Sequence, residues 1–212
     1  YTNILNILDL GKIEILAKDR KLDDPFVMVG GPCAYNSEPL ADFVDIVILG
    51  EGEEVNLEVL NVYKEWKKNK TTREDFLMMA SKIEGVYIPS FYDVTYNEDK
   101  TVKETIPNRD GIPANPRKRI IKNMDEVPYP EALIVPYIET VHERVVLELF
   151  RGCTRGCRFC QAGMIYRPIR EKSIETLKTS LDKLIKSTGY DEISLSSLST
   201  SDYSKLSELT DV

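Results

Sequence analysis

The sequence has one histidine, one tryptophan and four cysteines among its 212 residues. It has no apolar run near the roughly 18–20 residues that a membrane-spanning helix needs, and no basic-then-apolar segment typical of a signal peptide. Acidic residues outnumber basic ones by 35 to 28, for a net charge of −7. This balance argues against a nucleic-acid coat and against a protein that binds anionic membranes. We therefore expect a cytoplasmic protein with no membrane partner.

The rest of the composition is that of an ordinary globular protein, with 42% hydrophobic and 30% charged residues. The length suits one or two small domains. Three of the four cysteines lie within eight residues of one another. In a reducing compartment such crowding indicates a metal site rather than disulfides.

Both ends of the sequence have helical patterns. Apolar residues recur at helical spacing over residues 4–8, and Gly11 is a natural stop. Apolar residues also lie three apart over residues 206–212, behind the capping candidates Ser201 and Asp202. The first helix would need earlier chain to pack against, and the second stops without a Gly, Pro or basic finish. We therefore expect an internal piece of a longer protein.

Residues 1–70 have the pattern of the last part of an α/β domain. Apolar runs at 26–29 and 45–49 each end at glycine, which is typical of buried parallel strands, and a helical pattern follows the second run. This order predicts a doubly wound sheet, in which ligands bind beyond the carboxyl ends of the strands. Gly30 and Gly31 stand at such an end and are candidate cofactor-binding residues; the alternative is that they only form a tight turn.

Residues 71–144 form a proline-rich connector. Seven of the eleven prolines fall within residues 89–136, and proline is excluded from helix interiors and central strands. Alternating residues at 92–96 and 102–106 flank a polar turn and predict a β-hairpin. Residues 117–121 are a possible further strand, whose three basic side chains we interpret as a solvated face; a phosphate-binding patch is the alternative.

Three cysteines, Cys153, Cys157 and Cys160, follow a predicted strand over residues 145–150 at C-x₃-C-x₂-C spacing. Thiolates select iron–sulfur clusters, zinc or monovalent copper. A structural zinc site wants four protein ligands, and a 4Fe–4S cluster normally takes four cysteines. A cluster with three cysteines leaves one iron open to a small molecule.

Other potential ligands lie elsewhere in the sequence. His142 precedes the strand, and we assign it a structural or domain-interface role. Cys33 belongs to the N-terminal part and is expected to pack as a small hydrophobe. Positive charge lowers the pKa of neighbouring thiols. The basic residues around the three cysteines, with Glu171 as the single nearby acid, are Arg151, Arg155, Arg158, Arg167, Arg170 and Lys172.

This loop, with Phe159 directly before the last cysteine, resembles the radical S-adenosylmethionine (SAM) superfamily. The resemblance implies that Cys153, Cys157 and Cys160 hold three irons of a 4Fe–4S cluster. It implies that the methionine part of SAM chelates the fourth iron and that Phe159 approaches the adenine. An electron from the cluster would cleave SAM to a 5′-deoxyadenosyl radical acting on an unknown substrate, so the partners would include an electron donor. The alternative is a non-catalytic zinc- or iron-binding module built on the same loop.

The resemblance extends to the N-terminal part. Gly30-Gly31-Pro32 and the Gly50–Glu53 stretch look like the end of the cobalamin-binding-type domain that precedes the barrel in one branch of the superfamily. Residues 151–170 are similar to an uncharacterised subgroup of that branch. The Asp-x-His-x-x-Gly motif that supplies the cobalt ligand in such domains is missing from the sequence. Cobalamin is therefore a possible cofactor without support in this chain.

A second departure concerns the Gly-Gly-Glu motif with which the family holds the amine of SAM. The matching stretch, residues 192–201, is rich in serine instead. Serine hydroxyls accept hydrogen bonds from an ammonium group, so Ser196 and Ser197 are candidate cofactor-binding residues. A capped turn before the next helix is the alternative.

The segment after the cysteines predicts the start of a barrel. A helix between Ser173 and Gly189 would join the strand at 145–150 to a strand at 192–198, which makes one βαβ unit. Only 60 residues follow Gly152, whereas even a partial barrel needs about 200. Residues 145–212 are thus expected to be a truncated radical SAM barrel, inactive by itself, whose exposed strand edges form a dimer or a larger species.

Overall fold

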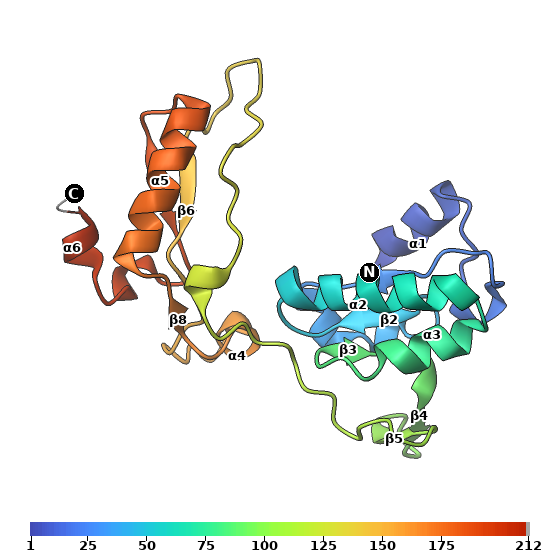
Figure 1. The fold of residues 1–212 in the computed structure, drawn as a ribbon. Coiled ribbons are helices and arrows are strands. Elements are labelled where there is room, and N and C mark those ends of the chain that lie inside the picture. Colours follow the sequence, from blue (N-terminus) through green and yellow to red (C-terminus); the bar gives the residue numbers. More distant parts are fainter. Residues whose placement is uncertain (211–212) are drawn as a thin grey trace. The chain divides into compact units, whose positions relative to one another are not determined.

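The computed structural model describes residues 1–210 and divides into two compact units (Figure 1). The first unit comprises residues 1–120, and the second begins at Ile121. Both contain helices and small sheets, so the predicted α/β class is confirmed in this general form. The finer domain boundaries, after residues 70 and 144, stay predictions. None of the helices within residues 1–210 combines the length and the apolar character needed to cross a membrane.

The first unit is built on a three-stranded sheet in the order β1-β2-β3. β1 (Met28–Val29) and β2 (Ile46–Ile48) are parallel, as their apolar runs predict. The third strand, β3 (Val86–Tyr87), is antiparallel to β2 and was not expected. β2 is fully buried because the helices of this unit cover the sheet. The doubly wound, cobalamin-binding-like description of this sheet stays a prediction.

Three helices belong to this unit: α1 (Thr2–Leu10), α2 (Gly52–Asn69) and α3 (Arg73–Ala80). α2 has acidic residues in its first turn and basic residues in its last turn, which complement the helix dipole. α3 begins with a capping box, in which the Thr72 hydroxyl accepts from the Asp75 N–H and the Asp75 carboxylate accepts from the Thr72 N–H. These local signals explain why the two helices form where they do.

The predicted β-hairpin is present as β4 (Tyr92–Tyr96) and β5 (Val102–Pro107), with Tyr92 opposite Pro107. The possible strand over 117–121 is reduced to a single bridge between Gly50 and Arg119. Gly50 has φ +107, and a Cβ atom there would lie 2.1 Å from the Arg119 carbonyl oxygen. The solvated-face interpretation is wrong for Arg119, because its side chain is only 17% exposed and its guanidinium pairs with Glu54 and Glu58.

The second unit contains a parallel βαβ unit, as predicted. β6 (Val145–Glu148) and β9 (Ile193–Ser196) pair in parallel, with Val145 beside Ile193. α5 (Ile174–Thr188) joins them and buries Leu177 and Leu184 against β6. The Ser173 hydroxyl accepts from the Thr176 N–H at 3.2 Å, and Gly189 ends the helix with φ +74. Both predicted caps are therefore confirmed.

The predicted strand at 145–150 is interrupted at Leu149, which corrects its continuous form. The Leu149 N–H donates to the Ser196 carbonyl, whereas the Leu149 carbonyl accepts from the Lys172 N–H. The chain changes partners at this residue and continues as β7 (Phe150–Arg151), which pairs antiparallel with β8 (Arg170–Glu171). The two short helices of this unit are α4 (Ala162–Ile165) and α6 (Leu206–Thr210).

The helix expected near the C-terminus begins later than predicted. Ser201 and Asp202 lie in a 3₁₀ turn before α6 and do not cap it. The last part of the predicted pattern, at residues 211–212, lies outside the described residues. The 3₁₀ helices of the chain are Ala17–Asp19, Pro32–Asn36, Glu38–Leu40, Pro89–Phe91, Met124–Glu126 and Thr200–Asp202.

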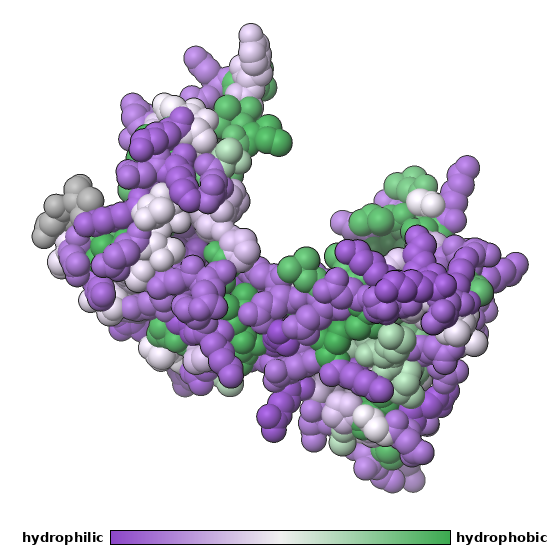
Figure 2. All heavy atoms as spheres, in the orientation of Figure 1, coloured by the Kyte–Doolittle hydropathy of each residue, from purple (hydrophilic) through white to green (hydrophobic). Residues whose placement is uncertain are grey.

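An extended loop precedes β6 and carries exposed apolar side chains, which form part of the hydrophobic surface of this unit in Figure 2. Tyr129, at the start of this loop, covers part of the edge of β6 that faces away from β9. Its hydroxyl donates to the Val146 carbonyl at 2.7 Å and accepts from the Glu148 N–H at 3.4 Å. The large exposed apolar residues of the loop are Leu133, Ile134, Val135, Tyr137, Ile138 and Val141.

Candidate metal centre

The three cysteines lie on one loop, residues 152–169, whose two ends are held together by β7 and β8. Arg151 lies opposite Arg170, and Phe150 opposite Glu171. Gly152 follows β7 with φ +96, and a Cβ atom there would lie 2.5 Å from the Pro168 carbonyl oxygen. Only glycine permits this close approach. The sequence thus closes the base of the loop through a strand pair and a glycine contact.

The three thiols are all free, with Cys153 and Cys160 half-buried and Cys157 exposed. Within residues 1–210, no three His, Cys, Asp or Glu side chains are placed as a ready cage for a metal ion. The donor set nevertheless fits a soft metal or an iron–sulfur cluster, since it consists of thiols alone. Gly156 has φ +65, and a Cβ there would meet only the Thr154 carbonyl at 3.9 Å. The loop therefore has space in which to adjust around a ligand.

Phe159, the predicted neighbour of the adenine, is 92% exposed. Burying an aromatic ring of this size stabilises a protein substantially, yet this ring takes no part in the hydrophobic cores of the described chain. Its position leaves the ring face accessible to a planar ligand beside the last cysteine.

A partly buried charged cluster at the end of β6 was not predicted from the sequence. Glu148 accepts from the Arg151 guanidinium at 2.8 and 3.2 Å. The ammonium of Lys172 lies 3.5 Å from the same carboxylate. Burial raises the pKa of Glu148, but the bonds and charges of Arg151 and Lys172 outweigh it and hold the pKa below its ordinary value. An acidic residue in an otherwise apolar strand is the sequence signal that points to this cluster.

The basic surroundings of the cysteines are thus more balanced than the sequence analysis assumed. Arg151 and Lys172 are paired with Glu148, and Arg155 is paired with Asp202. Arg170 donates to the carbonyl oxygens of Ile121, Tyr166 and Pro168. Glu171 is therefore not the only acid that acts on these cations.

The two candidate serines lie at the carboxyl end of the parallel pair, where Ser196 ends β9 and Ser197 follows it. Ser196 is exposed and lies opposite Glu148 in the register, so their side chains share one face. The Ser197 hydroxyl lies 3.1 Å from the Thr200 hydroxyl and accepts from the Ser199 N–H at 3.2 Å. The Ser197 contacts favour the capped-turn alternative for this residue, whereas Ser196 remains accessible.

The remaining candidates lie outside this loop. Gly31, in the first unit, has φ +91 and starts a 3₁₀ helix, with Gly30 directly before it. Cys33 is exposed, so the expectation that it packs as a hydrophobe is wrong: the 3₁₀ helix buries Ala34 in its place. His142 is exposed in the loop before β6, and its predicted structural role stays a prediction.

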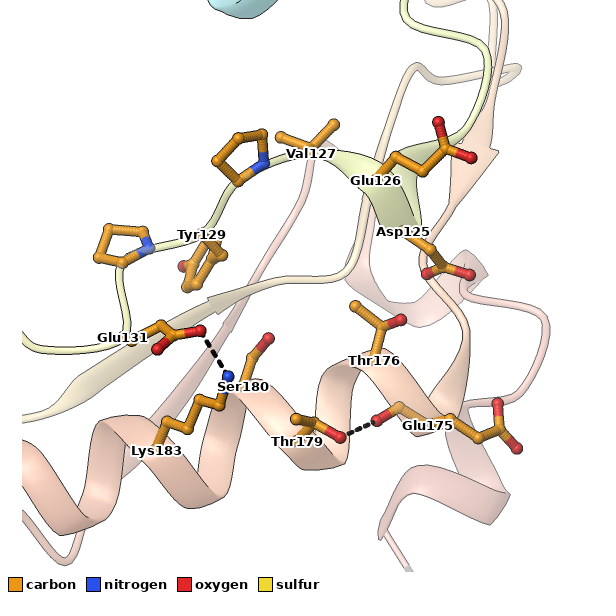
Figure 3. Close-up of a pocket in the computed structure, with 12 residues that line it drawn as sticks. Asp125, Glu126, Val127, Tyr129, Glu131, Glu175, Thr176, Thr179, Ser180 and Lys183 are labelled. Atoms are coloured by element: carbon orange, nitrogen blue, oxygen red, sulfur yellow. Dashed lines mark hydrogen bonds and ion pairs between the residues drawn. The ribbon is translucent and has the colours of Figure 1, made fainter.

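A groove of about 670 Å³ lies between residues 125–131 and α5 (Figure 3). Several of its charged side chains have partners within the chain: Lys183 pairs with Glu131, and the Asp125 carboxylate accepts from the Ser173 N–H at 2.7 Å. No cysteine lines it. We therefore regard it as the seam between the segment 125–131 and α5.

The first 89 residues match the family described as "Radical SAM proteins, N-terminal". Over these residues the chain is similar to radical SAM proteins. The match covers β1, β2 and β3, and it ends before the cysteine loop. The chain is also 29% identical, over 199 residues, to the uncharacterized protein MJ0966 of Methanocaldococcus jannaschii. The alignment covers 92% of the chain but 36% of that relative, so the chain spans about a third of the relative's length.

Proposed function

We propose that this chain carries the cluster-binding loop of a radical SAM enzyme, with Cys153, Cys157 and Cys160 as the ligands of a 4Fe–4S cluster. The observation that carries the proposal is the placement of three free thiols on one loop, which follows the first strand of a parallel βαβ unit after the two residues of β7. Active sites of barrels built from such units lie at the carboxyl ends of the strands. The family match of the first unit gives independent support.

In this proposal each of these residues has a distinct role. The thiols would hold the cluster, and β7 and β8 would keep the ends of the loop together. Phe159 would stack on the adenine of SAM, because its ring is exposed beside the last cysteine. Ser196 would accept from the amine of SAM at the carboxyl end of β9. When bound, the cluster supplies the electron that cleaves SAM reductively, and an external one-electron donor must replace that electron.

The proposal is tested by reconstituting the purified chain with iron and sulfide without oxygen, and by counting the metal that remains after desalting. About four irons and four sulfides per chain are expected. One zinc per chain, bound in preference to iron, would instead support the non-catalytic zinc module. Cys157→Ala should abolish iron binding, because two thiolates are too few to hold the cluster on an open loop. Cys33→Ala, which removes an exposed thiol in the first unit, is the matched control and should bind iron normally.

A further inference from the structure

The middle of the cysteine loop is tied to a segment far along the chain. Arg155 lies between Cys153 and Cys157, and its Nε donates to Oδ2 of Asp202 at 2.6 Å. Its Nη2 donates to Oδ1 of the same carboxylate. This bidentate pairing fixes direction as well as distance, because two parallel hydrogen bonds join two planar groups.

The carboxylate that receives Arg155 is held by its own turn. The Ser199 hydroxyl donates to Oδ2 of Asp202 at 2.7 Å. The Ser199 N–H donates in turn to the Ser197 hydroxyl. The hydrogen bonds from Arg155, followed by that from Ser199, hold the pKa of Asp202 below its ordinary value. The carboxylate is therefore ionised and oriented at neutral pH.

The turn that carries Asp202 is also anchored to β7 and β8, the two strands that close the loop. The ring of Tyr203 is buried and stacks on Phe150 of β7, with centroids 6.4 Å apart and planes inclined by 14°. The Tyr203 hydroxyl donates to the Lys172 carbonyl at 2.8 Å. The Ser204 N–H donates to Glu171 of β8 at 3.0 Å, and the Ser204 hydroxyl donates to the same carboxylate. We call residues 199–204 the platform.

We propose that Arg155 and Asp202 are positioning residues, which hold the segment between the first two cysteines against the platform and so place Cys153 and Cys157 for cluster binding. The role in cluster binding rests on the proposed function. The interaction between Arg155 and Asp202 does not depend on it, because both residues make it in the metal-free chain.

A charge on the loop is not enough for this role. Arg158 lies between the second and third cysteines and is exposed. Among the described residues it makes no ion pair with a carboxylate, whereas Arg155 donates two hydrogen bonds to one, from Nε and Nη2 on the same edge of its guanidinium. Arg158→Gln is therefore a matched control, since it removes the same charge from the same loop without breaking the tie.

The first test measures hydrogen exchange of the metal-free chain by mass spectrometry. Exposed ion pairs are weak, so Arg155→Gln and Asp202→Asn should each speed exchange over residues 153–160 by about two- to fivefold. The double variant should exchange no faster than either single variant, because both remove one interaction. Arg158→Gln should leave the rates unchanged. Equal exchange rates in all variants would show that the Arg155–Asp202 pair does not hold the loop.

The second test asks whether the tie serves the cluster. After reconstitution, Arg155→Gln and Asp202→Asn should retain less iron than the wild type and give a broadened electron paramagnetic resonance spectrum of the reduced cluster. Asp202→Glu, which keeps the carboxylate, should restore much of the wild-type spectrum. If the pair served stability alone, the variants would give the wild-type spectrum when they are compared with a control variant that has the same urea midpoint.

The outcomes separate the two proposals. Faster exchange with an unchanged spectrum and full iron content would overturn the positioning role while leaving the proposed function standing. A wild-type chain that binds no iron would overturn the proposed function, and with it the cluster part of this inference; the exchange rates would still decide whether the tie exists.

Discussion

The ammonium of Lys172 lies 3.5 Å from the carboxylate of Glu148, and the Lys172 side chain is only 2% exposed. The ring of Tyr129 covers the same ammonium, with its centroid 4.2 Å away. Burial lowers the pKa of Lys172, and the charge of Glu148 partly offsets this effect. This buried cation thus depends mainly on one carboxylate, which also accepts hydrogen bonds from Arg151.

We expect Glu148→Gln to destabilise the second unit more than Lys172→Met does. The glutamine leaves a buried ammonium without its counter-ion, and breaking such pairs costs about 3–5 kcal/mol when both groups are buried. Because Glu148 is 27% exposed, we expect about 2 kcal/mol. The methionine removes the buried charge and fills a similar volume, so its cost should be smaller.

Urea unfolding followed by circular dichroism measures this difference. The single tryptophan, Trp66, is buried in the first unit, so its fluorescence midpoint is an internal control and should not move. A larger loss of unfolding free energy in Lys172→Met than in Glu148→Gln would contradict the role given to the Glu148 carboxylate.

The base of the cysteine loop should not tolerate a Cβ atom at Gly152. Gly152→Ala combines φ +96 with a contact of 2.5 Å to the Pro168 carbonyl. Backbone strain of this kind costs about 1–3 kcal/mol, and the clash adds to it, so β7 and β8 should separate. We expect a lower urea midpoint and a reduced iron content after reconstitution.

Gly156→Ala is the comparison, because its φ is +65 but the nearest atom to an added Cβ lies 3.9 Å away. It should cost about 1 kcal/mol and leave the iron content near that of the wild type. Equal losses in both variants would mean that backbone conformation, rather than the approach of Pro168, limits this loop.

The parts of the fold that local patterns determine could be predicted from the sequence. The caps of α5 at Ser173 and Gly189 depend on neighbouring residues alone. The parallel pairing of β6 with β9 follows from the length of the crossover that joins them. The C-x₃-C-x₂-C spacing likewise lies within one short segment, so it can be recognised without knowledge of distant contacts.

The features that depend on distant partners could not be predicted in this way. Asp202 has the sequence pattern of a helix cap but is used by Arg155, 47 residues earlier in the chain. The break at Leu149 occurs because Lys172 takes over its carbonyl. Arg119 looks like a solvated residue until Glu54 and Glu58 are placed beside it. In each case a contact across many residues outweighs the local preference.

The stability of the second unit should fall in acid partly through Asp125. Burial raises the pKa of this carboxyl, but hydrogen bonds from Ser173 and Thr176 and the charge of Lys172 outweigh it and lower the pKa below the ordinary value of 3.8. A group with a lowered folded-state pKa stabilises the protein above its unfolded pKa, and this contribution is lost as the pH falls through the folded value. The loss should therefore appear below about pH 4.

Asp125→Asn should show a smaller fall of the urea midpoint than the wild type between pH 6 and pH 3, since it lacks the titrating group. Its midpoint at pH 6 should already be lower. Asp182→Asn, at an exposed position of α5, is the control and should follow the wild-type curve. Parallel curves for the wild type and Asp125→Asn would show that the carboxyl of Asp125 does not contribute.

Self-association should depend on Tyr129, which covers part of the free edge of β6. The hydroxyl satisfies the Val146 carbonyl at 2.7 Å and the Glu148 N–H at 3.4 Å. Unpaired groups at a strand edge pair readily with another chain, and the expected dimer would form through such edges. Tyr129→Phe uncovers these two groups while keeping the ring against Lys172, so it should associate at lower concentration than the wild type.

Sedimentation velocity over a hundredfold range of concentration measures this change, with Tyr137→Phe, whose side chain is fully exposed, as the control. If the wild type and Tyr129→Phe both stay monomeric throughout, the edge of β6 is not an association surface. If both form the same dimer at the same concentration, the contact lies elsewhere, and the outer edge of β9 is then the next surface to test.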